Sequence, residues 1–236
     1  MEENDPVKIG LSVLEGITPA KDEEVEKYEQ AMEEERQKEI KAKKELHYAK
    51  YANVPLRFLK ESLSTYKPSE ENRNQYNWLC GFVKSVQEKT NTKNILYING
   101  KFGRGKSHLA CGIIRELGGY LLTSLELCIA YDSCRDFKST MTRYEYLKKI
   151  CAEKVLVIDE VGKGIEAIEK QILPYIVNEF YGNKNILVFV GNGEEKDLYK
   201  LIGEAGADRM KEVGQIIPLI GESIRGKNDR KEMQGL

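Results

Sequence analysis

Eight consecutive residues decide the fold of this chain: Gly100-Lys101-Phe102-Gly103-Arg104-Gly105-Lys106-Ser107. They match the pattern G-x-x-x-x-G-K-[ST], which is the phosphate-binding P-loop. A P-loop connects a buried strand to a helix, and both flanks fit, because residues 94–98 and 108–114 are largely apolar. The stretch therefore predicts a nucleotide-binding α/β fold.

The residue types in this stretch suit a polyphosphate. Glycine at 100, 103 and 105 lets the backbone take left-handed or crowded conformations close to an anion. The loop amides and the N-terminus of the next helix direct partial positive charge toward that anion. We expect Lys106 to reach the β- and γ-phosphates of ATP and the Ser107 hydroxyl to bind Mg²⁺. The plain alternative is a glycine-rich turn before an ordinary helix. The predicted nucleotide-binding residues are Gly100, Lys101, Phe102, Gly103, Arg104, Gly105, Lys106, Ser107 and His108.

Two carboxylates, Asp159 and Glu160, follow the apolar run 155–158. Ligands of open α/β sheets bind at the carboxyl ends of the strands, so we expect both acids at the mouth of the P-loop, where the first and third strands meet. Asp159 would support Mg²⁺, and Glu160 would orient or deprotonate the attacking water. The alternative is a solvated acidic pair at a strand end. Asn192, after the fourth expected strand, is placed to hold the same water or the γ-phosphate, or to be an ordinary turn residue.

Apolar runs and amphipathic stretches alternate along the rest of the chain. The expected strands cover 94–98, 120–122, 155–158, 186–190 and 216–220. The expected helices lie before and between these strands, which predicts an α/β fold with a five-stranded parallel sheet flanked by helices. Only 16 residues follow Ile220, so no helical lid domain is expected.

The first fifty residues differ in composition from the rest. They carry 14 acidic and 9 basic side chains, whereas the whole chain of 236 residues has a net charge of −1. Strong helix formers dominate from Lys21 to about Lys50, with too few apolar residues for a packed face. We therefore expect a charged helical arm at 1–50 and a nucleotide-binding domain at 51–236. A solvated helix or linker is favoured over a coiled coil.

The composition also bears on where the protein works. It has five cysteines without a C-x-x-C pair, an acidic N-terminus without an apolar signal core, and no apolar run long enough for a membrane helix. These features predict a cytoplasmic protein that does not contact membranes.

Beyond the P-loop, the chain resembles a AAA+ ATPase. More narrowly, residues from about 51 to 227 resemble the DnaC/DnaI-type loaders of the bacterial replicative helicase and their IstB-like transposition relatives. The resemblance is carried by five motifs: Val54-Pro55, 105–110 (GKSHLA), 157–162 (VIDEVG), 203–210 (GE, then DRM) and 221–225 (GESIR). The chain departs from the family at 101–104, where a Pro- and Thr-containing loop is usual, and at Gly191, where Ser is usual. It also lacks the Cys/His cluster of the N-terminal zinc module in some loaders.

The resemblance implies roles for three residues near the end of the chain. Arg209 matches the arginine finger, which acts on ATP held by a neighbouring subunit, so self-association is implied. Arg225 matches the second sensor, which touches the γ-phosphate in its own subunit, and Asn192 matches the first sensor. Each arginine can instead be an ordinary surface residue. The implied reaction is a slow hydrolysis of ATP to ADP and phosphate, stimulated by a partner or by DNA.

The resemblance also implies two macromolecular partners. The charged arm would dock a replicative DNA helicase, and segment 125–152 would face single-stranded DNA. That segment contains cations for phosphates and aromatic rings for bases. The residues concerned are Arg135, Phe137, Lys138, Arg143, Tyr144, Tyr146, Lys148 and Lys149.

The implied function is an ATP-dependent loader that places a replicative helicase on single-stranded DNA during DNA replication, with hydrolysis as the release switch. One alternative is an IstB-like transposition helper ATPase, which would share the same site. Another is a binding module that uses ATP for assembly and hardly hydrolyses it. A small-molecule P-loop kinase is a weaker alternative, because it has no need of the acidic pair or the late arginines.

Overall fold

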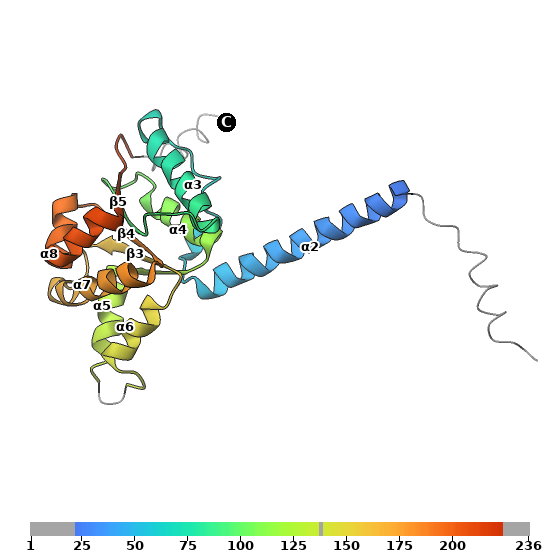
Figure 1. Ribbon diagram of the computed structural model, residues 1–236. Helices are drawn as coiled ribbons and strands as arrows, with labels where there is room; N and C mark the ends of the chain where they lie inside the picture. Colours follow the sequence, from blue (N-terminus) through green and yellow to red (C-terminus); the bar gives the residue numbers. More distant parts are fainter. Residues whose placement is uncertain (1–21, 137–138, 224–236) are drawn as a thin grey trace, which may run out of the picture. The chain divides into compact units, whose positions relative to one another are not determined.

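The computed structural model of the protein describes residues 22–136 and 139–223 (Figure 1). The chain divides into two compact units, residues 1–45 and residues 46–236. The described part of the first unit is helical, and the second unit contains a sheet with helices on both of its faces. The boundary between the units falls inside helix α2 (Asp22–Tyr51).

Helix α2 has the charged composition of an arm, and the helix expected from Lys21 to Lys50 is present. Its described side chains between Val25 and Lys43 are all exposed. Local pairs support it, such as Lys43 with Glu39 at 3.4 Å. Such pairs contribute only about 0.2–0.5 kcal/mol each, so helix propensity has to maintain most of this part of the helix. The end of α2 differs, because Tyr48 is buried in the core of the second unit.

The sheet has five parallel strands, as the sequence predicts. Their order is β2-β3-β4-β1-β5. β4 lies between β1 and β3, so the expectation that the first and third strands meet is wrong. The strands are β1 (Ile95–Asn99), β2 (Tyr120–Thr123), β3 (Val155–Val161), β4 (Ile186–Gly191) and β5 (Gly214–Pro218).

Helices cover both faces of the sheet, which explains why its central strands are apolar on both sides. Helices α3 and α4 lie on one face and α5 to α8 on the other (Figure 1). On β1, Leu96 and Ile98 belong to the core on the first face, whereas Ile95 and Tyr97 belong to the core on the second. This alternation follows from the two-residue period of a strand. The helices are α3 (Arg73–Gln87), α4 (Lys106–Leu117), α5 (Ser124–Ser133), α6 (Arg143–Cys151), α7 (Glu166–Asn183) and α8 (Glu195–Val213), with the short 3-10 helices η1 (Leu56–Phe58) and η2 (Glu70–Asn72).

The last strand ends earlier than the sequence indicates. β5 begins at Gly214 and stops at Pro218 instead of Ile220, and the Leu219 N–H still donates to the Asn99 carbonyl oxygen at 2.7 Å. Within the described residues, which reach Ser223, no helical domain follows β5. Over stretches 22–136 and 139–223, we find no helix with both the length and the apolar character that a membrane crossing requires.

Helices α5 and α6, which form most of the segment predicted to face DNA, each begin with a capping box. At α6 the Thr142 hydroxyl accepts the Glu145 N–H at 3.2 Å, and the Glu145 carboxylate accepts the Thr142 N–H at 2.8 Å. These bonds satisfy backbone donors that the first turn would otherwise leave unpaired. They also hold the pKa of the Glu145 carboxyl below its usual value.

Replacing Thr142 by Ala should lower the free energy of unfolding by about 1 kcal/mol at pH 7, measured by urea denaturation. Thr142 is exposed, so the loss reflects capping and not packing. Because the pKa of Glu145 is depressed in the fold, its part of the cap is present above its unfolded pKa and disappears as the pH falls through its folded pKa. Thr90→Ala, at an exposed threonine outside any capping box, is the control. A Thr142→Ala protein as stable as the parent would contradict the capping assignment.

Candidate nucleotide site

Residues 102–108 of the predicted nucleotide-binding stretch line one pocket together with the two acids and Asn192, whereas Gly100 and Lys101 are not among its lining residues. The pocket lies at the carboxyl ends of β1, β3 and β4, which reach the same edge because the strands are parallel. At this edge Asn99 lies opposite Gly191, and Gly191 lies opposite Val161. Because β4 separates β1 from β3, Asn192 stands between the P-loop and the acidic pair.

The P-loop backbone needs glycine at two positions where other segments come close. Gly100 has φ +142° and Gly103 has φ +76°, both in the region that favours glycine. A Cβ on Gly100 would lie 2.2 Å from the carbonyl oxygen of Leu219, and one on Gly103 would lie 2.0 Å from the Ser223 hydroxyl. The segment after β5 is therefore packed directly against the loop.

Lys106 points into the pocket and is only 9% exposed. Its Nζ donates to the carbonyl oxygens of Gly100 and Lys101 at 2.7 and 2.9 Å, and to Asn192 Oδ1 at 2.8 Å. These three acceptors are neutral, so a phosphate oxygen can replace one of them and gain a charge-assisted hydrogen bond. The contact places the Asn192 side chain beside the P-loop lysine, and its role as the first sensor stays a prediction.

Ser107 and Asp159 lie side by side, as a metal site requires. The Ser107 hydroxyl donates to Asp159 Oδ2 at 2.7 Å. Burial raises the pKa of the Asp159 carboxyl, and the hydrogen bonds from Ser107 and from the Glu160 N–H counteract part of this rise. A hydroxyl and a carboxylate are hard oxygen ligands of the kind Mg²⁺ uses beside a nucleotide, so these two residues fit the ion.

Glu160 occupies an unusual backbone conformation at the mouth of the pocket. Its φ of +57° lies in the left-handed region, which costs about 1 kcal/mol or more for a residue other than glycine. The β3–β4 register shifts between Ile158 and Val161, and such irregularities re-aim side chains. The carboxylate lies 3.5 Å from Lys163 Nζ, and about half of its side-chain surface is exposed. An exposed acceptor at this place suits the activation of water.

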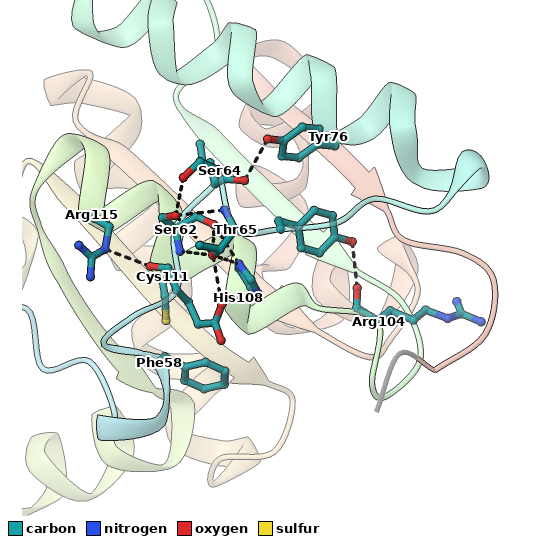
Figure 2. Close-up of polar contacts among 12 residues, drawn as sticks. Phe58, Ser62, Ser64, Thr65, Tyr76, Arg104, His108, Cys111 and Arg115 are labelled. Atoms are coloured by element: carbon teal, nitrogen blue, oxygen red, sulfur yellow. Dashed lines mark hydrogen bonds and ion pairs between the residues drawn. The ribbon is translucent and has the colours of Figure 1, made fainter. Parts of the chain in front are cut away.

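His108 and Arg104 line the pocket, but their polar atoms bind other segments of the chain. His108 Nδ1 lies 2.9 Å from a carboxylate oxygen of Glu61, and Nε2 lies 2.9 Å from the Ser62 carbonyl oxygen (Figure 2). The Arg104 guanidinium donates to the Leu219 carbonyl at 2.7 Å. Both side chains therefore anchor the P-loop region to its surroundings.

Three residues that line the pocket, Phe58, Lys163 and Gly191, were not among the site residues predicted from the sequence. Phe58 comes from η1, whose N-cap is Pro55, so the Val54-Pro55 motif was a signal that this segment mattered. Lys163 carries no motif of its own. It returns to the pocket because its N–H donates to the Glu160 carbonyl at 3.0 Å, and its Nζ then lies 4.5 Å from the Phe102 ring centroid.

The structure does not place the predicted arginine finger in the pocket of its own chain. Arg209 lies on α8, and its guanidinium stands 5.5 Å from the ring centroid of Tyr181 on α7. Among the described residues, those that line the pocket do not include it. The predicted second sensor, Arg225, lies outside the described residues.

The predicted DNA-facing segment, 125–152, proves partly occupied by internal contacts. Arg143 pairs with a carboxylate of α5 at 2.5 Å, and Lys148 pairs with a carboxylate of α7 at 3.0 Å. Tyr146 packs against the core. The predicted members that remain exposed are Arg135, Tyr144, Lys148 and Lys149, whereas Phe137 and Lys138 lie outside the described residues.

No protein-family model matches the chain. It is 30% identical over 142 residues to the replicative helicase loader DnaC of Escherichia coli strain K12, which is 58% of each chain. It is 32% identical over 123 residues to the DnaC of Buchnera aphidicola subspecies Acyrthosiphon pisum, 48% of each chain. The chain thus spans about half the length of the curated relatives it matches.

Solved structures share the fold. The crystal structure of the DnaC helicase loader matches with a TM-score of 0.60 and 20% identity, over 70% of this chain and 100% of that one. The crystal structure of DnaI matches with a TM-score of 0.57 and 21% identity, over 73% of this chain and 95% of that one. AMPPCP-bound DnaA from Aquifex aeolicus matches with a TM-score of 0.58 and 16% identity, over 78% of this chain and 56% of that one.

The parallel sheet, the P-loop and the acidic pair at the strand ends define the class: this chain has a P-loop α/β fold, which it shares with the solved DnaC, DnaI and DnaA structures. Within that class, its sequence and fold relate it to the DnaC-type replicative helicase loaders.

Replacing Asp159 by Asn should stabilise the nucleotide-free chain at neutral pH. Because the folded pKa of Asp159 is raised by burial, the fold binds its proton more tightly than the unfolded chain does, and stability falls as the pH rises through the unfolded pKa toward the folded one. The amide has no charge to bury. We expect the Asp159→Asn protein to have a higher melting temperature than the parent at pH 7. The difference between the two melting temperatures should narrow as the pH falls toward 4. Asp208→Asn, at an exposed carboxylate on α8, is the control. An unchanged melting temperature at pH 7 would contradict this account.

Proposed function

We propose that this protein is an ATP-dependent loader that places a replicative DNA helicase on single-stranded DNA during DNA replication. The observation that carries the loader role is the sequence relation to DnaC loaders over 142 residues. The pocket supports the ATP-dependent part, because it brings together a P-loop lysine, a hydroxyl–carboxylate pair and an exposed glutamate. Hydrolysis of ATP would release the loader from the helicase.

Five side chains of the pocket have a role in this proposal. Lys106 would exchange its neutral acceptors for the β- and γ-phosphates, and Asn192 would keep it oriented. Ser107 and Asp159 would hold Mg²⁺, which neutralises charge on the phosphates. Glu160 would accept a proton from the water that attacks the γ-phosphate. The turnover would be slow on its own and stimulated by partner or DNA.

We assign Arg209 as a finger that acts on the ATP of an adjacent subunit. Two observations support this: the side chain does not line its own pocket, and it lies half-buried on α8 with its guanidinium over Tyr181. An arginine finger contributes about 10³–10⁵ in turnover by stabilising charge in the transition state. Turnover would then require self-association.

The remaining partners follow from the same proposal. The charged arm that includes α2 would dock the helicase, and segment 125–152 would contact single-stranded DNA through its exposed cations and Tyr144. DnaA, which shares the fold, has been solved with AMPPCP and single-stranded DNA bound to it. Both partners place the work of the protein in the cytoplasm.

A loading assay tests the function. The hexameric replicative helicase of the same organism would be mixed with the protein, ATP and circular single-stranded DNA carrying an annealed oligonucleotide, and displacement of the oligonucleotide would be measured. We expect displacement with the parent and none with Lys106→Ala, whose ATP affinity should fall about 100-fold or more. Lys170→Ala, at an exposed surface lysine on α7, is the control. Failure of the parent to bind the helicase, with capture of a transposase instead, would favour the IstB-like alternative.

A mixing experiment tests the finger. Arg209→Ala should leave ATP affinity unchanged and lower turnover about 10³-fold, because only the transition state loses a contact. Mixing Arg209→Ala with Lys106→Ala should restore part of the activity, since the first supplies an intact pocket and the second an intact finger. Lys211→Ala, two residues further along α8, is the matched control. Full activity of Arg209→Ala alone would refute the assignment.

A further inference from the structure

A buried carboxylate lies behind the nucleotide site and has no role in the chemistry above. Glu169, in the first turn of α7, is only 1% exposed. Its Oε1 accepts hydrogen bonds from the Ser124 hydroxyl, from the Gly162 N–H at 2.9 Å and from the Gly164 N–H at 3.4 Å. Burying a carboxylate is costly unless donors surround it. The three donors that converge on this oxygen therefore show which parts of the chain the Glu169 carboxylate holds in place.

The two backbone donors belong to the loop that follows Glu160. Gly162 has φ +84°, and the Lys163 N–H closes the turn on the Glu160 carbonyl at 3.0 Å. Glu169 therefore fixes the far end of a turn whose near end is Glu160. Because Glu160 itself has an unfavourable φ, its orientation depends on such external constraints.

The third donor comes from a different element. Ser124 is the first residue of α5 and is fully buried. α5 and the loop also pack closely together, because a Cβ on Gly164 would lie 3.0 Å from both the Ser124 carbonyl oxygen and Cys128 Sγ. A displacement of the N-terminus of α5 would therefore move the loop as well.

We propose that Glu169 is a positioning residue for Glu160, and that through Ser124 it makes the geometry of the ATP site depend on the position of α5. This inference rests on the proposed ATPase activity and adds a residue to it. Glu169 does not line the pocket, so its effect reaches the nucleotide only through the loop. It provides a physical connection between segment 125–152 and the carboxylate that activates water.

The test compares Glu169→Gln, Ser124→Ala and the matched control Glu166→Gln in the full-length chain, with Mg²⁺, helicase and single-stranded DNA present. Glu166 lies in the same turn of α7, but its side chain is 74% exposed and pairs with Lys170. ATP turnover, the affinity for a fluorescent ATP analogue and the melting temperature would be measured for each protein. Glu169→Gln keeps the volume but removes the charge that strengthens all three hydrogen bonds.

We expect Glu169→Gln to lower kcat about 10-fold or more, and Ser124→Ala to lower it about 3-fold or more, with nucleotide affinity within about twofold of the parent. Glu166→Gln should match the parent. Parental kcat in Glu169→Gln would overturn the positioning role, and parental kcat in Ser124→Ala would overturn the dependence on α5. Parallel losses of kcat and nucleotide affinity would indicate general damage and overturn both. A parent that binds ATP without hydrolysing it would refute the proposed ATPase itself, independently of the variants.

Discussion

Two hydrogen bonds from consecutive residues of one helix determine the geometry of the whole site. Lys106 Nζ reaches Asn192 at the end of β4, and the Ser107 hydroxyl reaches Asp159 at the end of β3. Because both donors stand in the first turn of α4, these bonds hold the N-terminus of the helix against the edge of the sheet. The positive end of the helix dipole and the unpaired amides of the first turn are thereby directed into the pocket. The P-loop glycines make this approach possible.

A second constraint holds α4 from the side away from the sheet. The Arg115 guanidinium donates to the Leu59 and Glu61 carbonyls, and His108 contacts Glu61 and Ser62 in the same segment (Figure 2). Gly112 permits the close approach, because a Cβ there would lie 2.8 Å from the Leu63 nitrogen. The P-loop helix is therefore held between the sheet and this segment. Such pre-organisation lets the site bind a charged ligand without reordering its own backbone.

The site costs stability that the two apolar cores have to offset. Asp159 is buried enough for its pKa to be raised, Glu160 has a left-handed backbone conformation, and Lys106 is a nearly buried cation. Each of these features is unfavourable in the isolated chain and becomes useful once a polyphosphate and a cation enter. Strain and buried charge at functional sites commonly have this origin. The buried Glu169 fits the same pattern, since it stabilises a loop conformation that the local sequence would not maintain.

The sequence by itself determined the P-loop, the five parallel strands and the acidic pair after the third strand, because each is encoded by a short run of neighbouring residues. Only the tertiary structure decided that β4 separates β1 from β3, that Asn192 binds Lys106, and that Phe58 and Lys163 enter the pocket. It alone decided that Glu169 is buried beneath the loop after Glu160. The physical reason is that strand order and side-chain burial depend on pairings between segments far apart in the chain, which leave no periodic signal in the residues that make them.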